Sequence, residues 1–209
     1  MRHTAIFAAT LAVLLALAAP AWAGMEEDCM QVHDLDTKVS GCTVVIRSGQ
    51  WQGKDLAWAY NNRGIANAEL GNPARAIEDY DQALRLNPGF IKARANRGIA
   101  YNGLAWDLYL KGRNAQALDN ADRSLSDRPD SAAAINTRAH VLAALGRRNE
   151  ALGAFERVMR VGGADWVRTY QEALAKHGYY PGAIYGGGYR PQTQAALVAC
   201  LDAGCRLLE

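Results

Sequence analysis

Residues 58–89 read WAYNNRGIANAELGNPARAIEDYDQALRLNPG, a stretch that contains two helical patterns separated by a turn. On both sides of the Gly-Asn-Pro sequence at 71–73, apolar and small residues recur at the three- and four-residue spacing of a helix face. Glycine and proline favour turns, and a second such sequence, Asn-Pro-Gly at 87–89, ends the stretch. No alternating pattern typical of a strand competes with it. The stretch therefore predicts two helices joined by a short turn.

The same pattern returns further along the chain. The triplet Asn-Arg-Gly at 62–64 recurs at 96–98, which is 34 residues later. An alanine followed by a large aliphatic residue occurs at 76–77, 117–118 and 151–152, so the two intervals are 41 and 34 residues. Seven extra residues therefore lie in the second copy, at about 105–111. Because seven residues make almost two helical turns, they are expected to lengthen one helix without turning its apolar face away from the core.

The residues that share this period form three sets: Tyr60, Gly64, Ala76, Tyr80, Ala83 and Pro88; Arg94, Gly98, Tyr101, Ala117, Ala121 and Pro129; and Ile135, Ala139, Leu142, Ala151, Phe155 and Val158. With this spacing the chain resembles the tetratricopeptide repeat, over residues 56–163 and in three copies, 56–90, 91–131 and 132–163. The resemblance implies an all-α fold, an α-α superhelical solenoid of about three helix pairs. Within a pair, Gly64 and Ala76 are expected to let the helices approach closely beside Tyr80.

The first 23 residues have the order of an export signal. A positive head is followed by about 15 apolar residues, a proline and the small residues Ala21 and Ala23. We expect cleavage after Ala23 and a mature chain in the periplasm. The alternative is a retained anchor, but the apolar run is shorter than the roughly 20 residues that span a bilayer. No later stretch is apolar for long enough, so we expect no membrane span in the mature chain.

Four cysteines lie in two local pairs, Cys29 with Cys42 and Cys200 with Cys205. An oxidising compartment favours one disulfide in each pair, although four cysteines allow three connectivities and buried free thiols are the alternative. A bridge between Cys200 and Cys205 requires the helix to end first, because five residues of continuous helix separate two Cα atoms too widely. Gly204 is placed to end it. The first bridge is expected to tie down a segment, 24–55, that caps the repeats.

Residues 164–209 differ from the repeats: a helical pattern is followed by a loop rich in glycine and tyrosine, then by a second helical pattern. The residues Val167, Arg168, Gln171, Leu174, Gly178, Tyr179, Gly182, Ile184, Gly186, Pro191, Thr193, Ala196 and Leu197 resemble the peptidoglycan-binding-like domain of cell-wall enzymes. The resemblance implies a small helical module that binds glycan. Its stacking surface would be the four loop tyrosines, Tyr179, Tyr180, Tyr185 and Tyr189. The alternative is that these tyrosines form a small core without a ligand.

Charge and motifs exclude several function classes. The formal charge is only +2, from 23 basic and 21 acidic side chains, which disfavours a nucleic-acid partner. The sequence has no Gly-x-Ser-x-Gly elbow and no phosphate-binding loop. Its histidines are isolated, and none lies at zinc-ligand spacing from a cysteine pair. We therefore expect a protein that is not an enzyme and holds no metal or cofactor.

The repeat resemblance also implies a concave groove formed by the first helix of each pair. The positions carried over to this groove are Trp58, Asn62, Ile65, Lys92, Asn96, Ile99, Asn136, Thr137 and His140. Asparagine suits such a groove because its amide both donates to and accepts from a peptide backbone. The alternative for each position is ordinary exposure on a helix. The resulting hypothesis is a noncatalytic periplasmic scaffold that binds a peptide or protein partner, and the alternative is a peptidoglycan-binding module that recruits an envelope enzyme.

Three arginines in register, Arg63, Arg97 and Arg138, are interpreted as structural. A guanidinium at this position can reach backbone carbonyls or acidic side chains of the adjoining repeat. We expect these arginines to fasten the stack.

Overall fold

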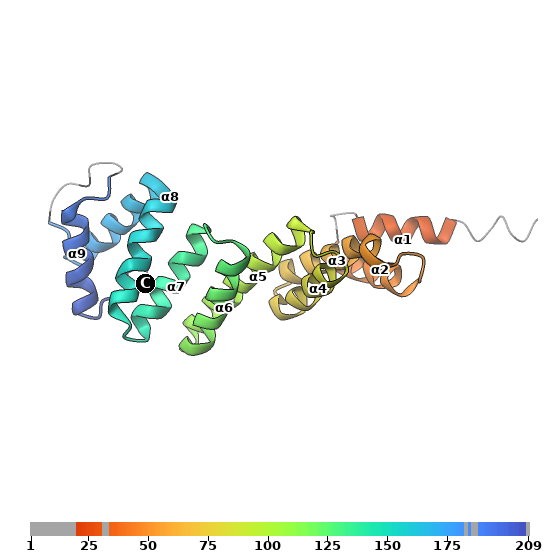
Figure 1. Cartoon of the computed structure of the whole chain (residues 1–209), viewed down its shortest axis with the longest axis horizontal. Helices are drawn as coiled ribbons and strands as arrows, with labels where there is room; N and C mark the ends of the chain where they lie inside the picture. The colour runs from red at the N-terminus through yellow and green to blue at the C-terminus, as the bar shows by residue number, and fades with distance from the viewer. Residues whose placement is uncertain (1–19, 31–33, 182–183, 185–187, 208–209) are drawn as a thin grey trace, which may run out of the picture. The chain divides into compact units, whose positions relative to one another are not determined.

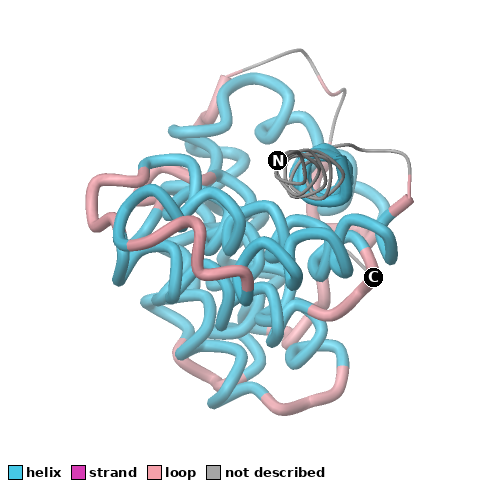
Figure 2. Tube along the Cα trace, turned by 90° about the vertical axis from the view of Figure 1, so that its right-hand side faces the viewer, coloured by secondary structure: helices cyan, strands magenta, loops and turns pink. Residues whose placement is uncertain are grey.

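The computed structural model describes residues 20–30, 34–181, 184 and 188–207. All regular structure within these ranges is helical, which confirms the all-α prediction (Figures 1 and 2). The elements are α1 (Pro20–Met30), α2 (Leu35–Arg47), a short 3-10 helix η1 (Gly53–Leu56), α3 (Ala57–Glu69), α4 (Pro73–Leu86), α5 (Ile91–Leu110), α6 (Asn114–Asp127), α7 (Ala132–Ala144), α8 (Arg148–Lys176) and α9 (Pro191–Asp202).

The chain divides into two compact units. The first ends at Arg94 and the second begins at Ala95, so the division falls inside α5. The predicted capping segment therefore lies in the first unit, and the predicted C-terminal module, 164–209, lies in the second unit together with the third repeat.

In the first unit, the Cys29–Cys42 disulfide joins α1 to α2, with a Cα–Cα distance of 4.5 Å. The two buried cysteines pack with Val45 and Ala59, so the bridge forms part of a small core against α3. Local pairing of these cysteines is as the sequence predicted.

The α3–α4 pair shows why its small residues are needed. A Cβ atom placed on Gly64 would lie 2.7 Å from Cε1 of Tyr80, which is too close for a real side chain. Ala76 is fully buried and Tyr80 is 2% exposed. The predicted close approach of the two helices is therefore observed.

In the second unit, α5 contains the predicted insertion. It has 20 residues, whereas α3 and α7 have 13 each, so the difference is the seven residues inferred from the repeat spacing. The added turns keep an apolar face inward, since Leu108 is buried against Ala117 and Val141. The insertion thus lengthens a helix without displacing the helix from its core.

The recurring arginines each bind an aspartate. Arg63 and Arg97 bind the second helix of their own hairpin, whereas Arg138 reaches back to α6. Arg63 also donates to the hydroxyl of Thr43 on α2. The prediction that these arginines reach acidic side chains of the adjoining repeat is therefore confirmed for Arg138, whereas the aspartates bound by Arg63 and Arg97 lie within their own hairpins. The pairs are Arg63 with Asp79 at 2.6 Å, Arg97 with Asp127 at 2.7 Å and Arg138 with Asp122 at 2.6 Å.

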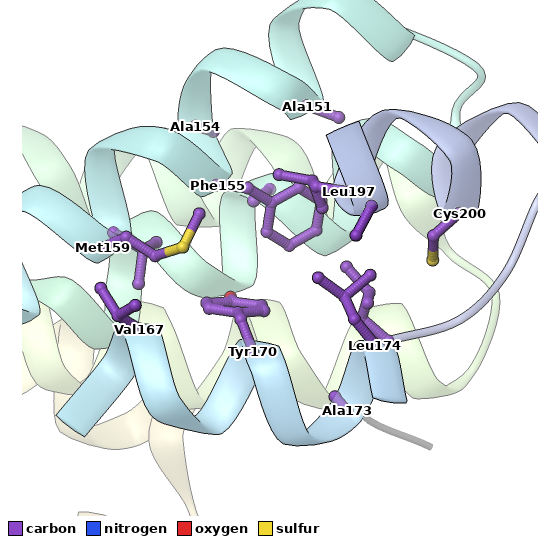
Figure 3. Close-up of a cluster of buried hydrophobic side chains, with 14 of the residues drawn as sticks. Ala151, Ala154, Phe155, Met159, Val167, Tyr170, Ala173, Leu174, Leu197 and Cys200 are labelled. Carbon is purple, nitrogen blue, oxygen red and sulfur yellow. The ribbon is translucent and has the colours of Figure 1, made fainter. Parts of the chain in front are cut away.

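Helix α8 changes direction at Gly163, whose φ of 70° is not helical. The part after this residue and α9 share one core with α7 and the first part of α8 (Figure 3). Figure 3 shows Phe155 from before the kink and Tyr170 from after it facing each other, and their ring centroids are 5.5 Å apart. The segment after Gly163 therefore continues the packing of the third repeat.

The second disulfide has the predicted local pairing. Helix α9 ends at Asp202, and Gly204 has the left-handed φ of 67° that allows the chain to turn back. The amide of Cys205 then donates to the carbonyl of Cys200 at 2.9 Å, and the two Cα atoms lie 5.1 Å apart. The helix does end before the bridge closes, as the spacing required.

In the described part of the chain, no helix combines the length and the apolar character that a membrane span needs. Most of the predicted export signal, residues 1–19, lies outside the described residues. Helix α1 runs through the predicted cleavage position after Ala23.

Candidate functional site

The groove residues predicted in the first unit lie on α3 and α5. Trp58, Asn62 and Ile65 are partly buried, while Lys92 is exposed. The amide of Asn62 donates to the carbonyl of Cys29 at 3.3 Å. The indole of Trp58 meets Trp51 edge to face, with ring centroids 6.0 Å apart. Two of these side chains therefore help to hold the disulfide-linked cap against α3.

In the second unit, the two predicted residues of α5 remain accessible. Asn96 is partly buried and Ile99 is 54% exposed. The groove prediction is compatible with the placement of these two side chains.

The third predicted set is not accessible. Asn136, Thr137 and His140 are 8%, 2% and 4% exposed, so these α7 residues do not line an open groove. Asn136 is covered by the part of α8 after Gly163, whereas His140 is covered by rings of α5 and of the first part of α8. The hydroxyl of Tyr170 donates to Oδ1 of Asn136, and the hydroxyl of Thr137 donates to the carbonyl of Ala133 at 3.1 Å. The predicted open groove is therefore wrong for Asn136 and Thr137, while His140 lines the pocket described below.

His140 lies in a cluster of aromatic rings. Its ring centroid is 5.1 Å from that of Phe155, 5.9 Å from that of Trp106 and 6.1 Å from that of Tyr109. Trp106 and Tyr109 both come from the last turns of the lengthened α5. The aromatic side chains of the insertion thus reach the third repeat.

Replacing Asn136 with alanine is expected to destabilise the second unit by about 2 kcal/mol, because it leaves the buried hydroxyl of Tyr170 without its acceptor. Burial already raises the pKa of that hydroxyl, so it cannot ionise as compensation. Urea denaturation followed by circular dichroism measures the effect. Asn136→Ala with Tyr170→Phe is the control, and most of the loss should be absent on the Tyr170→Phe background. Equal losses on both backgrounds would exclude the hydrogen bond as the cause.

The residues behind the peptidoglycan-binding resemblance are mostly used internally. Gln171 and Thr193 are 1% and 0% exposed, and the Gln171 amide donates to the Thr193 hydroxyl at 3.0 Å. Leu174, Ala196 and Leu197 belong to the shared core. These motif positions therefore hold α8 and α9 together.

The three predicted glycan-binding tyrosines that the structure describes do not form a common exposed surface. Tyr180 is buried and Tyr179 packs against the core, whereas Tyr185 lies outside the described residues. Tyr189 is 39% exposed, and its hydroxyl donates to Oε1 of Glu156 at 2.8 Å. Burial, reinforced by this carboxylate, raises the pKa of Tyr189. Of the three described tyrosines, Tyr189 is exposed, Tyr179 is partly buried and Tyr180 is buried.

The second unit contains a cavity of about 530 Å³. One wall is the end of α5 with the first residue of α6, and a second is the end of α7 with the start of α8. The third is the chain from the end of α9 through its disulfide turn. We call this cavity the C-terminal pocket. The lining residues are Tyr109, Leu110, Gly112, Asn114, His140, Ala143, Ala144, Gly146, Arg148, Phe155, Leu201, Asp202, Gly204, Cys205, Arg206 and Leu207.

Charged and polar groups occupy part of the lining. Arg148 binds Asp202 across the C-terminal pocket at 2.6 Å, which joins the start of α8 to the end of α9. Arg206 adds a second guanidinium. The buried Oδ1 atom of Asn114 has no hydrogen-bond donor. The lining of the pocket thus combines apolar side chains with charged ones, and Arg148 and Asp202 among these are paired.

Among the predicted site residues within the described part of the chain, only His140 and the disulfide cysteine Cys205 line the C-terminal pocket. Its other lining residues were not predicted, because they come from helix ends and turns that are far apart in the sequence: the end of α5, the end of α7 with the start of α8, and the chain from the end of α9. The seven-residue insertion is the feature of the sequence that could have indicated this pocket. Extra residues in one copy of a repeat often project toward a binding face.

Comparisons with known proteins support the repeats. The sequence pattern described as "Tetratricopeptide repeat" matches residues 57–90 and 131–162. Sperm-associated antigen 1 of Rattus norvegicus is 34% identical over 85 residues, which is 41% of this chain and 9% of that protein. This chain therefore spans less than a tenth of the length of that relative.

Two solved structures have a similar fold. A tetratricopeptide repeat protein from Parabacteroides merdae has a TM-score of 0.52 at 19% identity, covering 76% of this chain and 61% of its own. MamA from Desulfovibrio magneticus RS-1 has a TM-score of 0.51 at 14% identity, covering 88% and 90%. At these identities the likeness concerns the fold alone. The chain contains tetratricopeptide repeats, and such helix pairs are protein-binding scaffolds.

Proposed function

We propose that this tetratricopeptide-repeat chain is a noncatalytic scaffold that holds a peptide or protein partner in the C-terminal pocket. The observation that supports this proposal is the cavity of about 530 Å³. Its volume lies in the range of ligand sites, and its lining combines apolar side chains with a few polar groups, as binding sites do. The repeats supply a rigid frame on which such a pocket is formed between helix ends.

The pocket replaces part of the groove predicted from the sequence. The α7 residues Asn136 and Thr137 are buried and are not available to a partner. The accessible end of the same helix, at Ala143 and Ala144, lines the C-terminal pocket instead. A partner would therefore contact α7 at its last turn.

A photocrosslinking amino acid tests this site. It would replace Leu110, which lines the pocket and is 61% exposed, or Ile99, which is 54% exposed on the same helix and does not line the pocket. We expect a discrete partner adduct in living cells from position 110 and none from position 99. An adduct only from position 99 would favour the groove predicted from the sequence, and the absence of adducts at both positions would contradict the scaffold function.

We also propose that the protein acts in the periplasm, which rests on the export-signal pattern of residues 1–23 and on the two disulfides. Expression with its own leader in a Gram-negative host is expected to yield a periplasmic protein whose first residue is Gly24. A chain that keeps residues 1–23 would contradict this proposal.

We do not assign peptidoglycan binding to residues 164–209, because the motif residues Gln171 and Thr193 bind each other within the core. Purified protein is expected to stay in the supernatant when cell-wall sacculi are sedimented. Cosedimentation that Tyr189→Ala abolishes would restore the alternative function.

A further inference from the structure

The turn after α9 has the hydrogen bonds of a Schellman motif. Gly204 has a positive φ, and its amide donates to the carbonyl of Leu201 at 3.2 Å. The amide of Cys205 donates to the carbonyl of Cys200 at 2.9 Å. An apolar contact between the first and last residues often accompanies this motif. At α9 a disulfide joins these two residues instead.

Other turns of the chain show what this disulfide adds. Helices α3, α5 and α7 end in the same hydrogen-bond pattern without a bridge, at Gly71, Gly112 and Gly146. Each of these turns leads directly into the next helix, which fixes the turn from its far side. After Gly204 the described chain continues to Leu207 without helical structure. The disulfide therefore fixes a turn that no following helix fixes within the described residues.

The bridge also holds the third wall of the C-terminal pocket. Residues 204–207 all line this pocket. Cys200 is 0% exposed and belongs to the shared core, so the bridge joins the wall to a fixed point of α9. Leu207 is 3% exposed in the same core, two residues after Cys205. Loss of the bridge would remove the covalent constraint on this wall.

The two disulfides of the chain differ in access. Cys29 and Cys42 are both 0% exposed, so the first bridge is covered on both sides. In the second bridge Cys200 is covered as well, whereas Cys205 is partly exposed and lines the pocket. Thiol–disulfide exchange requires a thiolate to reach one of the two sulfur atoms, and exposed bridges are the labile ones. A reductant can therefore approach the second bridge from the pocket.

We infer that Cys205 is a site of thiol–disulfide exchange, and that reduction of its bridge by a dithiol loosens the third wall of the C-terminal pocket. A thiolate of the dithiol attacks Sγ of Cys205 and forms a mixed disulfide, and Cys200 leaves as a thiolate that takes up a proton. The second thiol of the dithiol loses its proton and attacks the sulfur atom that its first thiol contributed. This step releases Cys205, which takes up a proton, and the dithiol becomes a disulfide.

The consequence for a partner rests on the proposed function. The oxidised bridge keeps the third wall in place, so the oxidised protein is the form that holds the partner. A partner seated in the pocket covers Cys205 and slows its attack by a thiolate. Partner binding and reduction therefore oppose each other, as two linked equilibria must.

Selective reduction of the oxidised full-length protein tests the exchange site. Treatment with dithiothreitol, trapping of the new thiols with N-ethylmaleimide and peptide mapping give a rate for each bridge. We expect the Cys200–Cys205 bridge to open at least about tenfold faster than the Cys29–Cys42 bridge in the folded protein, and the two rates to converge in urea. Equal rates in the folded protein, or the same ratio of rates in urea, would overturn the inference.

Amide hydrogen exchange tests whether reduction loosens the wall. After selective reduction we expect the amide of Cys205 to exchange at least about tenfold faster, because its turn opens more often. The matched control is the amide of Arg147, which donates to the carbonyl of Leu142 at 2.9 Å in the corresponding turn after α7. An unchanged rate at Cys205, or equal acceleration at both amides, would contradict a local effect of the bridge.

The photocrosslinking amino acid at position 110 connects the bridge to the partner. We expect Cys200→Ser with Cys205→Ser to reduce the partner adduct at least about fivefold, because the partner must then order a loose wall. Cys29→Ser with Cys42→Ser is the control and should leave the adduct unchanged. An adduct that survives the first pair of substitutions, or that both pairs reduce equally, would overturn the role of this bridge at the pocket.

The two proposals can fail separately. The absence of any adduct from the chain with both bridges intact would contradict the scaffold function. The rates of reduction and of hydrogen exchange need no partner, so they decide on the exchange site and on the loosening of the wall in either case.

Discussion

Replacing Asp79 with alanine is expected to destabilise the first unit by about 3 kcal/mol. The carboxylate is 5% exposed and accepts from Nη2 of Arg63 at 2.6 Å and from the Asn67 amide at 3.0 Å. Its removal leaves a guanidinium and a buried amide without their acceptor. The side chain of Arg63 is 22% exposed, so solvent recovers part of the loss and the expected value lies at the low end for a broken buried pair. Urea denaturation followed by circular dichroism measures it.

The control for Asp79 is an ion pair on the surface. Asp119 and Arg123 are 2.9 Å apart on α6, with side chains 60% and 57% exposed. Asp119→Ala is expected to cost about 0.5 kcal/mol or less, because water screens this pair. If the two substitutions cost the same, the buried network of Asp79 is not a significant source of stability.

The sequence predicted most of the helix pairs, because the turn residues and the residue spacing that determine them lie close together in the chain. Turn residues at 71–73 and the three- and four-residue spacing identify α3 and α4. The repeat offset of seven residues predicted the lengthened α5, since a near multiple of the helix period leaves the apolar face almost unchanged. Both disulfides were predictable from short separations and a glycine that ends a helix.

The burial of the third repeat could not be predicted in the same way. Whether the first helix of a pair has an open face depends on the helices that pack next to it in the stack, and no interaction within 132–163 determines this. The sequence after Gly163 resembled another family, so α7 was expected to be open. One signal pointed the other way: Ala173 stands 34 residues after Ala139, and both are buried at the positions where a repeat needs a small residue.

The C-terminal pocket could not be predicted either, because it also depends on packing between helices that are distant in the sequence. Its walls come from the ends of α5, α7 and α9, which are brought together only when the whole second unit is packed. Arg148 and Asp202 are 54 residues apart in sequence and meet at 2.6 Å. Nothing in the spacing of these two residues indicates an interaction, since neither belongs to the repeat pattern.

Deleting residues 164–209 is expected to abolish cooperative folding of the second unit. The segment supplies several large core side chains that pack against Phe155 and its neighbours: Val167, Tyr170, Leu174, Leu197 and Leu207. Each such side chain contributes about 1.5–3 kcal/mol when buried, so together they contribute on the order of 10 kcal/mol. That is comparable to the whole stability of a typical domain, about 5–15 kcal/mol. Thermal melting followed by circular dichroism is the measurement.

Two variants of the full-length chain make this deletion interpretable. Leu197→Ala removes one fully buried side chain and should cost about 3 kcal/mol, whereas Tyr189→Ala changes a partly exposed residue and should cost less than about 1 kcal/mol. If residues 164–209 folded as a separate module, the truncated chain would keep the helix content per residue and the melting temperature of the repeats. Because Tyr170 binds Asn136 and Phe155 packs on Tyr170, we expect the third repeat to lose its structure when the segment is removed.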